Sequence, residues 1–163
     1  MRLTSDQLTI YLHDHLAGAT FGLELARRAA RQNAGSVYGA FLKELATEIA
    51  EDRASLERIM GRVDAGRDEL KNALAWTGEK LGRLKLNGRV RGYAPLSRVV
   101  ELEGLITGVQ GKLRLWRALH EVAGDYDELD ATELNRLITR AERQLSGLGE
   151  HHLIAVRDAF GRS

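Results

Sequence analysis

Cysteine is absent from this 163-residue chain, and proline occurs once, at Pro95. The lack of thiols excludes disulfides, cysteine-ligated zinc and thiol nucleophiles, and it fits a reducing compartment. Proline is the residue that most often breaks a helix, so its scarcity permits long helices. Aromatic residues make up only 6% of the chain, too few for a typical β-sandwich.

The chain also lacks signals for export or membrane insertion. No run of about 18 apolar residues is present, so we expect no membrane-spanning helix. The N-terminal stretch MRLTSDQLTIYLHDHLAG carries charges and histidines where a signal peptide needs an apolar run, which favours a cytoplasmic protein. The formal net charge of +1 indicates no general attraction to nucleic acid or membrane.

The chain does contain apolar residues at helical spacing. They recur every three or four positions in four long segments, and more briefly in a fifth. This pattern predicts long helices at about residues 5–33, 37–62, 98–123 and 131–160, and a short one at about 67–81.

Residues that favour helix ends support these boundaries. Asn33 and Gly35 suit the C-terminal end of the first helix. Ser36 and Ser97 are expected to cap the second and third long helices, and Asp130 the fourth.

Loop lengths predict how the helices connect. The first two long helices are joined by a short turn, as are the last two, so each pair should be antiparallel. The connection between the pairs, about 33 residues from 64 to 96, is long enough to run the length of a helix. We therefore predict one all-α domain over 1–163, an antiparallel four-helix bundle of the ferritin-like type with a long helical crossover between helices two and three. A plain up-down-up-down bundle is the alternative.

Three stretches of sequence carry a resemblance to a known family. The segments WTGEKLGRLKLNGRV and PLSRVVELE, together with YLHDHLAGATFGLELARR, resemble an uncharacterised bacterial family in the ferritin-like four-helix-bundle superfamily. The resemblance covers most of the chain and implies this fold without an assigned activity. Ferritin-like di-iron proteins use Glu-x-x-His motifs, but no histidine here has a glutamate three residues before it. The resemblance therefore implies no metal ligand.

Polar residues interrupt the apolar stripes of the long helices. His15, Asp52, His120 and His152 each fall within the stripe of their own helix. Buried charges and imidazoles need partners, so such residues usually meet. Heights along the bundle can be counted in residues from the end that carries the Gly35 turn. With the ferritin-like crossover, His15, Asp52 and His120 lie at similar heights. In the plain bundle, His152 instead of His120 lies at the height of Asp52.

This predicted His–Asp–His layer has several interpretations. We favour a structural network in which Asp52 accepts a hydrogen bond from His15. The alternative is a divalent metal site for Fe, Mn or Zn formed by His15, Asp52 and His120, with Glu48 as a further ligand. An acid–base pair is a third interpretation. We expect no catalytic residue and no cofactor.

Glycines within the predicted helices indicate close packing of another backbone. Each interior glycine costs helix stability, so a cluster of them needs a structural reason. Our first explanation is that the crossover lies over the third long helix, and a homodimer interface is the alternative. The glycines concerned are Gly18, Gly22, Gly104, Gly108 and Gly111.

The crossover itself is basic. From position 80 in the crossover to position 100 in the next helix, the chain has six basic residues and no acidic one, a pattern that suits an anionic ligand. The residues assigned to such a site are Lys80, Arg83, Lys85, Arg89 and Arg91. We expect a non-enzymatic helical-bundle protein with a binding or interaction role. The alternatives are a metal-dependent protein and an adaptor that binds anions or, less expected, nucleic acid through the crossover.

Overall fold

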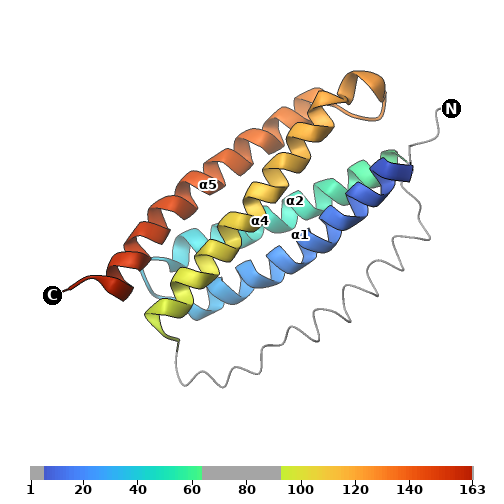
Figure 1. Ribbon diagram of the computed structural model, residues 1–163. Coiled ribbons are helices and arrows are strands. Elements are labelled where there is room, and N and C mark those ends of the chain that lie inside the picture. The colour runs from blue at the N-terminus through green and yellow to red at the C-terminus, as the bar shows by residue number, and fades with distance from the viewer. Residues whose placement is uncertain (1–5, 64–92, 163) are drawn as a thin grey trace.

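The computed structural model describes residues 6–63 and 93–162, which contain four long α-helices, one 3₁₀ turn and no strand. The helices lie lengthwise beside one another as a bundle (Figure 1). The all-α, four-helix part of the prediction is confirmed. The short helix predicted at 67–81 lies outside the described residues. The elements are α1 (Asp6–Gln32), α2 (Gly39–Arg62), α4 (Pro95–Glu121), η1 (Ala123–Asp125) and α5 (Ala131–Phe160).

The starts of the later helices follow local backbone chemistry. α4 begins at Pro95, about three residues earlier than predicted, because the fixed φ of proline suits the first helical turn. Ala94 therefore holds the N-cap position that was predicted for Ser97. At α5 the predicted cap is confirmed, since Asp130 Oδ1 accepts a hydrogen bond from the Thr132 backbone N–H at 2.8 Å.

The turn between α1 and α2 depends on Gly35, whose φ of 79° lies in the left-handed region that favours glycine. Ser36 does not cap α2 as predicted, because α2 begins at Gly39 with Tyr38 in the N-cap position. The Ser36 hydroxyl instead donates to the carbonyl of Asn33 at 2.7 Å and accepts from the Tyr38 N–H at 3.2 Å. The serine thus stabilises the turn rather than the helix.

Each helix packs on two others. α1 lies against α2 and α4, and α5 packs on α4 along its length (Figure 1). The start of α4 lies beside the end of α1, where Asn33 donates to Tyr93 Oη at 3.0 Å and accepts from Arg98 Nε at 2.7 Å. Tyr93 in turn donates to Glu101 at 2.6 Å, and burial together with this bond raises the Tyr93 pKa to about 12.

The seam between α2 and α5 is the loosest of the four and is crossed by long charged side chains. Arg62 lies 2.5 Å from Glu133, and Arg140 lies 2.6 Å from Glu51. Tyr38, at the start of α2, donates to Asp158 near the end of α5 at 2.6 Å. Ion pairs and hydrogen bonds therefore hold this edge.

The core lies between the helices and is dominated by leucine. Burying each such side chain stabilises the fold by about 1.5–3 kcal/mol. No helix among the described residues has both the length and the hydropathy needed to cross a membrane. The largest fully buried side chains are Trp116, Tyr38, Leu12, Leu16, Leu42, Leu45, Leu56, Ile59, Leu102, Leu105, Leu115 and Leu119.

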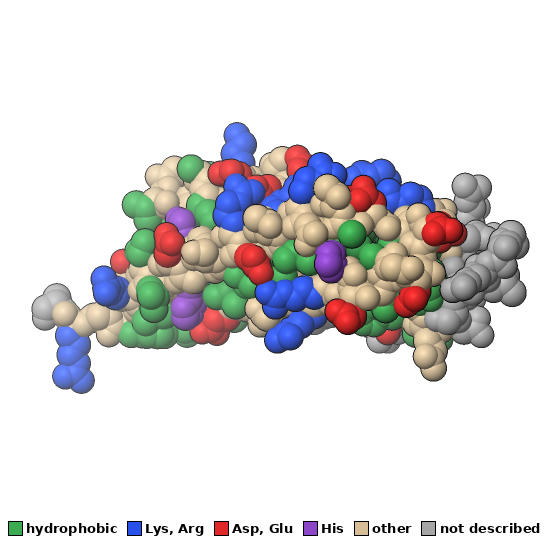
Figure 2. Space-filling model, turned by 90° about the horizontal axis from the view of Figure 1, so that it is seen from above, with side chains coloured by type: hydrophobic (Ala, Val, Ile, Leu, Met, Phe, Trp, Pro, Cys, Tyr) green, Lys and Arg blue, Asp and Glu red, His purple; other side chains and the backbone are tan. Residues whose placement is uncertain are grey.

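The surface mixes charges of both signs. On the face shown in Figure 2, acidic and apolar side chains are scattered among the basic ones, several of which gather along the upper edge. Several large apolar residues are well exposed, among them Ile10, Val100 and Leu153.

Candidate functional site

A cavity of about 320 Å³ lies between α1, α2 and α4. Its volume is at the lower end of the range for small-molecule sites, which commonly occur between the helices of bundles. Much of the wall is apolar and includes Leu56, Leu105 and Trp116. The polar lining residues are Asp14, His15, Asp52, Arg53, Thr107 and Lys112.

Five glycines of α1 and α4 also line the cavity. A Cβ atom built on Gly18, Gly22, Gly108 or Gly111 would meet no atom of the described residues within 4 Å. Only Gly104 lies tightly packed, with its Cβ position 3.0 Å from Leu25 Cδ2. Within residues 6–63 and 93–162 these glycines therefore make space instead of admitting another backbone. The crossover that was expected to cover them lies outside the described residues.

A buried ion pair forms part of the lining. Lys112 Nζ in α4 donates to Asp52 Oδ2 in α2 at 2.5 Å. The side chain of Asp52 is 2% exposed and that of Lys112 is 14% exposed. Gln144 of α5 accepts from Lys112 Nζ at 2.5 Å and donates to Asp52 Oδ2 at 3.3 Å. These three side chains connect α2, α4 and α5 at one level of the bundle.

Burial lowers the pKa of Lys112, because desolvation disfavours the ammonium form. The charge of Asp52 and its hydrogen bond act in the opposite direction but do not outweigh burial. Arg140 of α5 also approaches this carboxylate, with its Nε 3.4 Å from Asp52 Oδ1. The contact lacks hydrogen-bond geometry, so Oδ1 has no hydrogen-bond partner among the described residues.

Trp116 lies one helical turn after Lys112 and belongs to the same wall. Its side chain is only 1% exposed, and its indole N–H has no acceptor within the described ranges. Most buried donors in proteins are paired, so an unpaired indole N–H beside a cavity calls for an explanation. Trp116 therefore belongs to the core as well as to the cavity wall.

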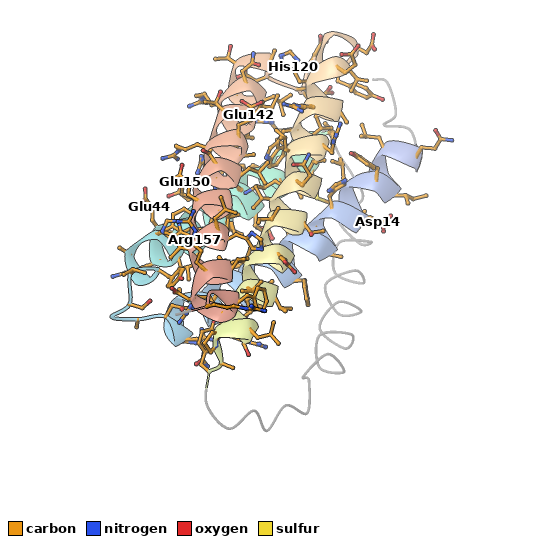
Figure 3. All side chains as sticks on the ribbon, turned by 60° about the vertical axis from the view of Figure 1, so that its left-hand side comes forward. Asp14, Glu44, His120, Glu142, Glu150 and Arg157 are labelled. Atoms are coloured by element: carbon orange, nitrogen blue, oxygen red, sulfur yellow. The ribbon has the colours of Figure 1, made fainter. Side chains whose placement is uncertain are left out.

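His15 lines the cavity from α1 and packs edge-on against Tyr11, with ring centroids 4.5 Å apart. Burial lowers the His15 pKa, and the nearby charge of Asp14 raises it by less. Asp14 itself is an exposed residue of the lining and projects from α1 (Figure 3). The His15 imidazole is therefore neutral near pH 7 and can donate or accept a hydrogen bond.

The predicted partners of Asp52 are wrong. Asp52 is bound by Lys112 and Gln144, whereas neither His15 nor His120 makes a hydrogen bond to it. His120 lies roughly 12 Å farther along α4 than Lys112, at about 1.5 Å per residue. Figure 3 shows it near the end of α4 that leads into α5. The predicted heights of Asp52 and His120 were treated as similar, but the difference between them is too large for contact.

The other two candidates also have different partners. Glu48 accepts from Gln144 at 3.0 Å and pairs with Arg143, and His152 lies 3.1 Å from Glu103. Among residues 6–63 and 93–162, no three His, Asp or Glu side chains are grouped so that they could hold a metal ion. The proposed ligands His15, Asp52, His120 and Glu48 therefore do not come together.

The basic residues assigned to an anion site lie outside the described residues, so that site stays a prediction. They are Lys80, Arg83, Lys85, Arg89 and Arg91.

Sequence reasoning missed Lys112 and Gln144, because lysine and glutamine on a helix usually lie at the surface. One signal was present. The interior charge at Asp52 requires a counter-charge, and Lys112 lies at nearly the same distance from the start of α4 as Asp52 does from the Gly35 turn.

No model of a known protein family matches the chain, and neither a curated protein nor a solved structure matches it. The resemblance to a ferritin-like bacterial family therefore stays a prediction. The site has to be interpreted from its own chemistry.

Proposed function

We propose that this protein is a non-enzymatic helical-bundle protein that binds a small, mostly apolar molecule in the cavity between α1, α2 and α4. The observation that carries the proposal is the cavity's construction from glycines. Four of them have room for a Cβ atom, although alanine would make each helix more stable. Sequence positions that give up stability in this way are typical of binding sites.

The polar lining supports binding more than catalysis. Asp52 and Lys112 are engaged with each other and with Gln144, so neither is a free base or nucleophile. A small number of polar groups in an apolar wall is the usual composition of a ligand site, where those groups orient the ligand. The proposal needs no cofactor.

For the fold, we propose the antiparallel ferritin-like arrangement with the chain between α2 and α4 crossing the length of the bundle. The contact of Asn33 with Tyr93 supports it, because α4 then starts beside the end of α1 and not beside the end of α2. The pairs across α2 and α5 also support it. Residue numbers rise along α2 from Tyr38 to Arg62 while those of their partners fall from Asp158 to Glu133.

Calorimetric titration of the full chain with n-butylbenzene and with butyrophenone tests the proposed function. We expect saturable one-to-one binding of at least one of them. Gly108→Leu should weaken it about tenfold or more, because the leucine enters the cavity. Gly149→Leu is the matched control, since Gly149 also has open space but lies on α5, away from the lining.

Circular dichroism would confirm that both variants keep their helices. If neither molecule binds the unmodified chain, the cavity is not a ligand site. A second copy of the chain would then be the better candidate to cover it. Equal weakening by both glycine substitutions would also contradict the proposal.

The two other functions considered from the sequence have no specific observation in their favour. Metal binding by His15, Asp52, His120 and Glu48 is not proposed, because these side chains do not come together among the described residues. Anion binding through the crossover stays a prediction.

A further inference from the structure

We propose that the ligand is electrically neutral and carries a hydrogen-bond acceptor, such as a ketone or other carbonyl oxygen, on an apolar body of about a dozen non-hydrogen atoms. The acceptor would lie at the end of the cavity formed by Lys112 and Trp116. This inference rests on the proposed function and specifies the chemical class of its ligand.

The first argument is the supply of donors. Lys112 has three N–H groups, and acceptors within the described ranges occupy two of them, on Asp52 and Gln144. The Trp116 indole N–H has none. The two residues are four positions apart on one helix, so their side chains are neighbours, and both line the cavity. A buried donor without an acceptor costs free energy that a ligand oxygen would recover.

The second argument is charge. The charged residues in the lining are two carboxylates, Asp14 and Asp52, and two cations, Arg53 and Lys112. Burial lowers the pKa of His15, so the imidazole adds no charge near neutral pH. Lys112 is already neutralised by Asp52 at 2.5 Å, and Arg53 lies 3.0 Å from Glu57. A carboxylate ligand would therefore be desolvated without gaining a free counter-charge.

The third argument is size. An apolar cavity of about 150 Å³ holds one benzene molecule, so about 320 Å³ has room for roughly twice as many atoms. The wall beyond Lys112 and Trp116 offers leucine side chains and bare glycine backbone, which suit a hydrocarbon body.

Three molecules of nearly the same shape, each of about 11 non-hydrogen atoms, separate the alternatives within this volume. Butyrophenone is neutral with an acceptor, n-butylbenzene is neutral without one, and 4-propylbenzoate is an anion. Calorimetry on the full chain should show butyrophenone binding about tenfold more tightly than either of the others. In Trp116→Phe, which keeps a ring but lacks the N–H, that preference should fall to about twofold or less.

An independent measurement does not depend on that variant folding. The chain has two tryptophans, so Trp76→Phe leaves one indole N–H signal in a nitrogen–proton correlation spectrum. Butyrophenone should shift the Trp116 signal downfield, and n-butylbenzene should not.

The outcomes separate this inference from the proposed function. Equal binding of n-butylbenzene and butyrophenone, or tighter binding of 4-propylbenzoate, overturns the neutral-acceptor ligand and leaves the binding function standing. An unshifted indole signal at saturating butyrophenone overturns it as well. No binding of any of the three overturns both.

Discussion

The carboxylate of Asp52 on α2 and the ammonium of Lys112 on α4 lie 2.5 Å apart inside the bundle, between helices that are far apart in sequence. Each charge is tolerable at that depth only because the other is present. Gln144 bonds to both and fixes their relative position. This pair is at once an element of the core and part of the cavity lining.

A double-mutant cycle on this pair should be strongly non-additive. Asp52→Leu or Lys112→Met alone leaves one buried charge without its main partner and should lower the free energy of unfolding by about 3 kcal/mol. The double variant should be more stable than either single one. Urea denaturation of the four proteins measures this, and additive losses would show that the two charges do not depend on each other.

Two glycines of α5 should respond oppositely to alanine. A Cβ on Gly147 would lie 2.5 Å from Cε2 of Phe41, whose ring is stacked on His151 at 4.1 Å and cannot easily move. Gly147→Ala should therefore destabilise the protein by about 1 kcal/mol, since overpacking outweighs the gain in helix propensity. Gly149→Ala meets no described atom within 4 Å and should stabilise it by about 0.5–1 kcal/mol. Thermal unfolding of both variants checks the signs, and a shift in the same direction would contradict this packing of Phe41.

The pH dependence of stability should carry a contribution from His15. Burial lowers its pKa in the folded protein below the ordinary value of 6.5. The unfolded chain therefore binds more protons at that position, and stability falls as the pH decreases through about 6.5. His15→Gln should reduce this loss of stability between about pH 7 and pH 5. Denaturation midpoints across that range measure the effect. An imidazole that titrates at or above 6.5 in the folded protein would refute it.

The helices could be predicted because each depends on local patterns. Apolar periodicity placed all four, and Asp130 marked the start of α5 correctly. The error at α4 was small, because Pro95 and Ser97 both favour a helix start and proline prevailed. Asp52 was also identified correctly as a polar residue in the core, since its position in the stripe of α2 decides its burial.

The partners of Asp52 could not be predicted in the same way. Which side chain reaches a buried carboxylate depends on the relative rotation and height of three helices. A difference in height of five residues between two helices already amounts to about 7 Å. A lysine has a long apolar stem that can cross such a distance, so Lys112 looked like a surface residue while its ammonium lies inside. The cavity was missed because it is the space that five glycines leave, and that space exists only once α1 and α4 are in position.

Because the seam between α2 and α5 is loose, neighbouring helices pack less closely at this edge of the bundle than at the other three. Three of its edges close by contact between helices, while this one is bridged largely by arginine and glutamate side chains that reach into solvent. Such solvent-exposed bridges weaken as the salt concentration rises, whereas apolar packing is hardly affected by it. Added salt should therefore weaken this edge more than the edges that close by apolar packing. The two helical hairpins, α1–α2 and α4–α5, would therefore separate first along the edge between α2 and α5.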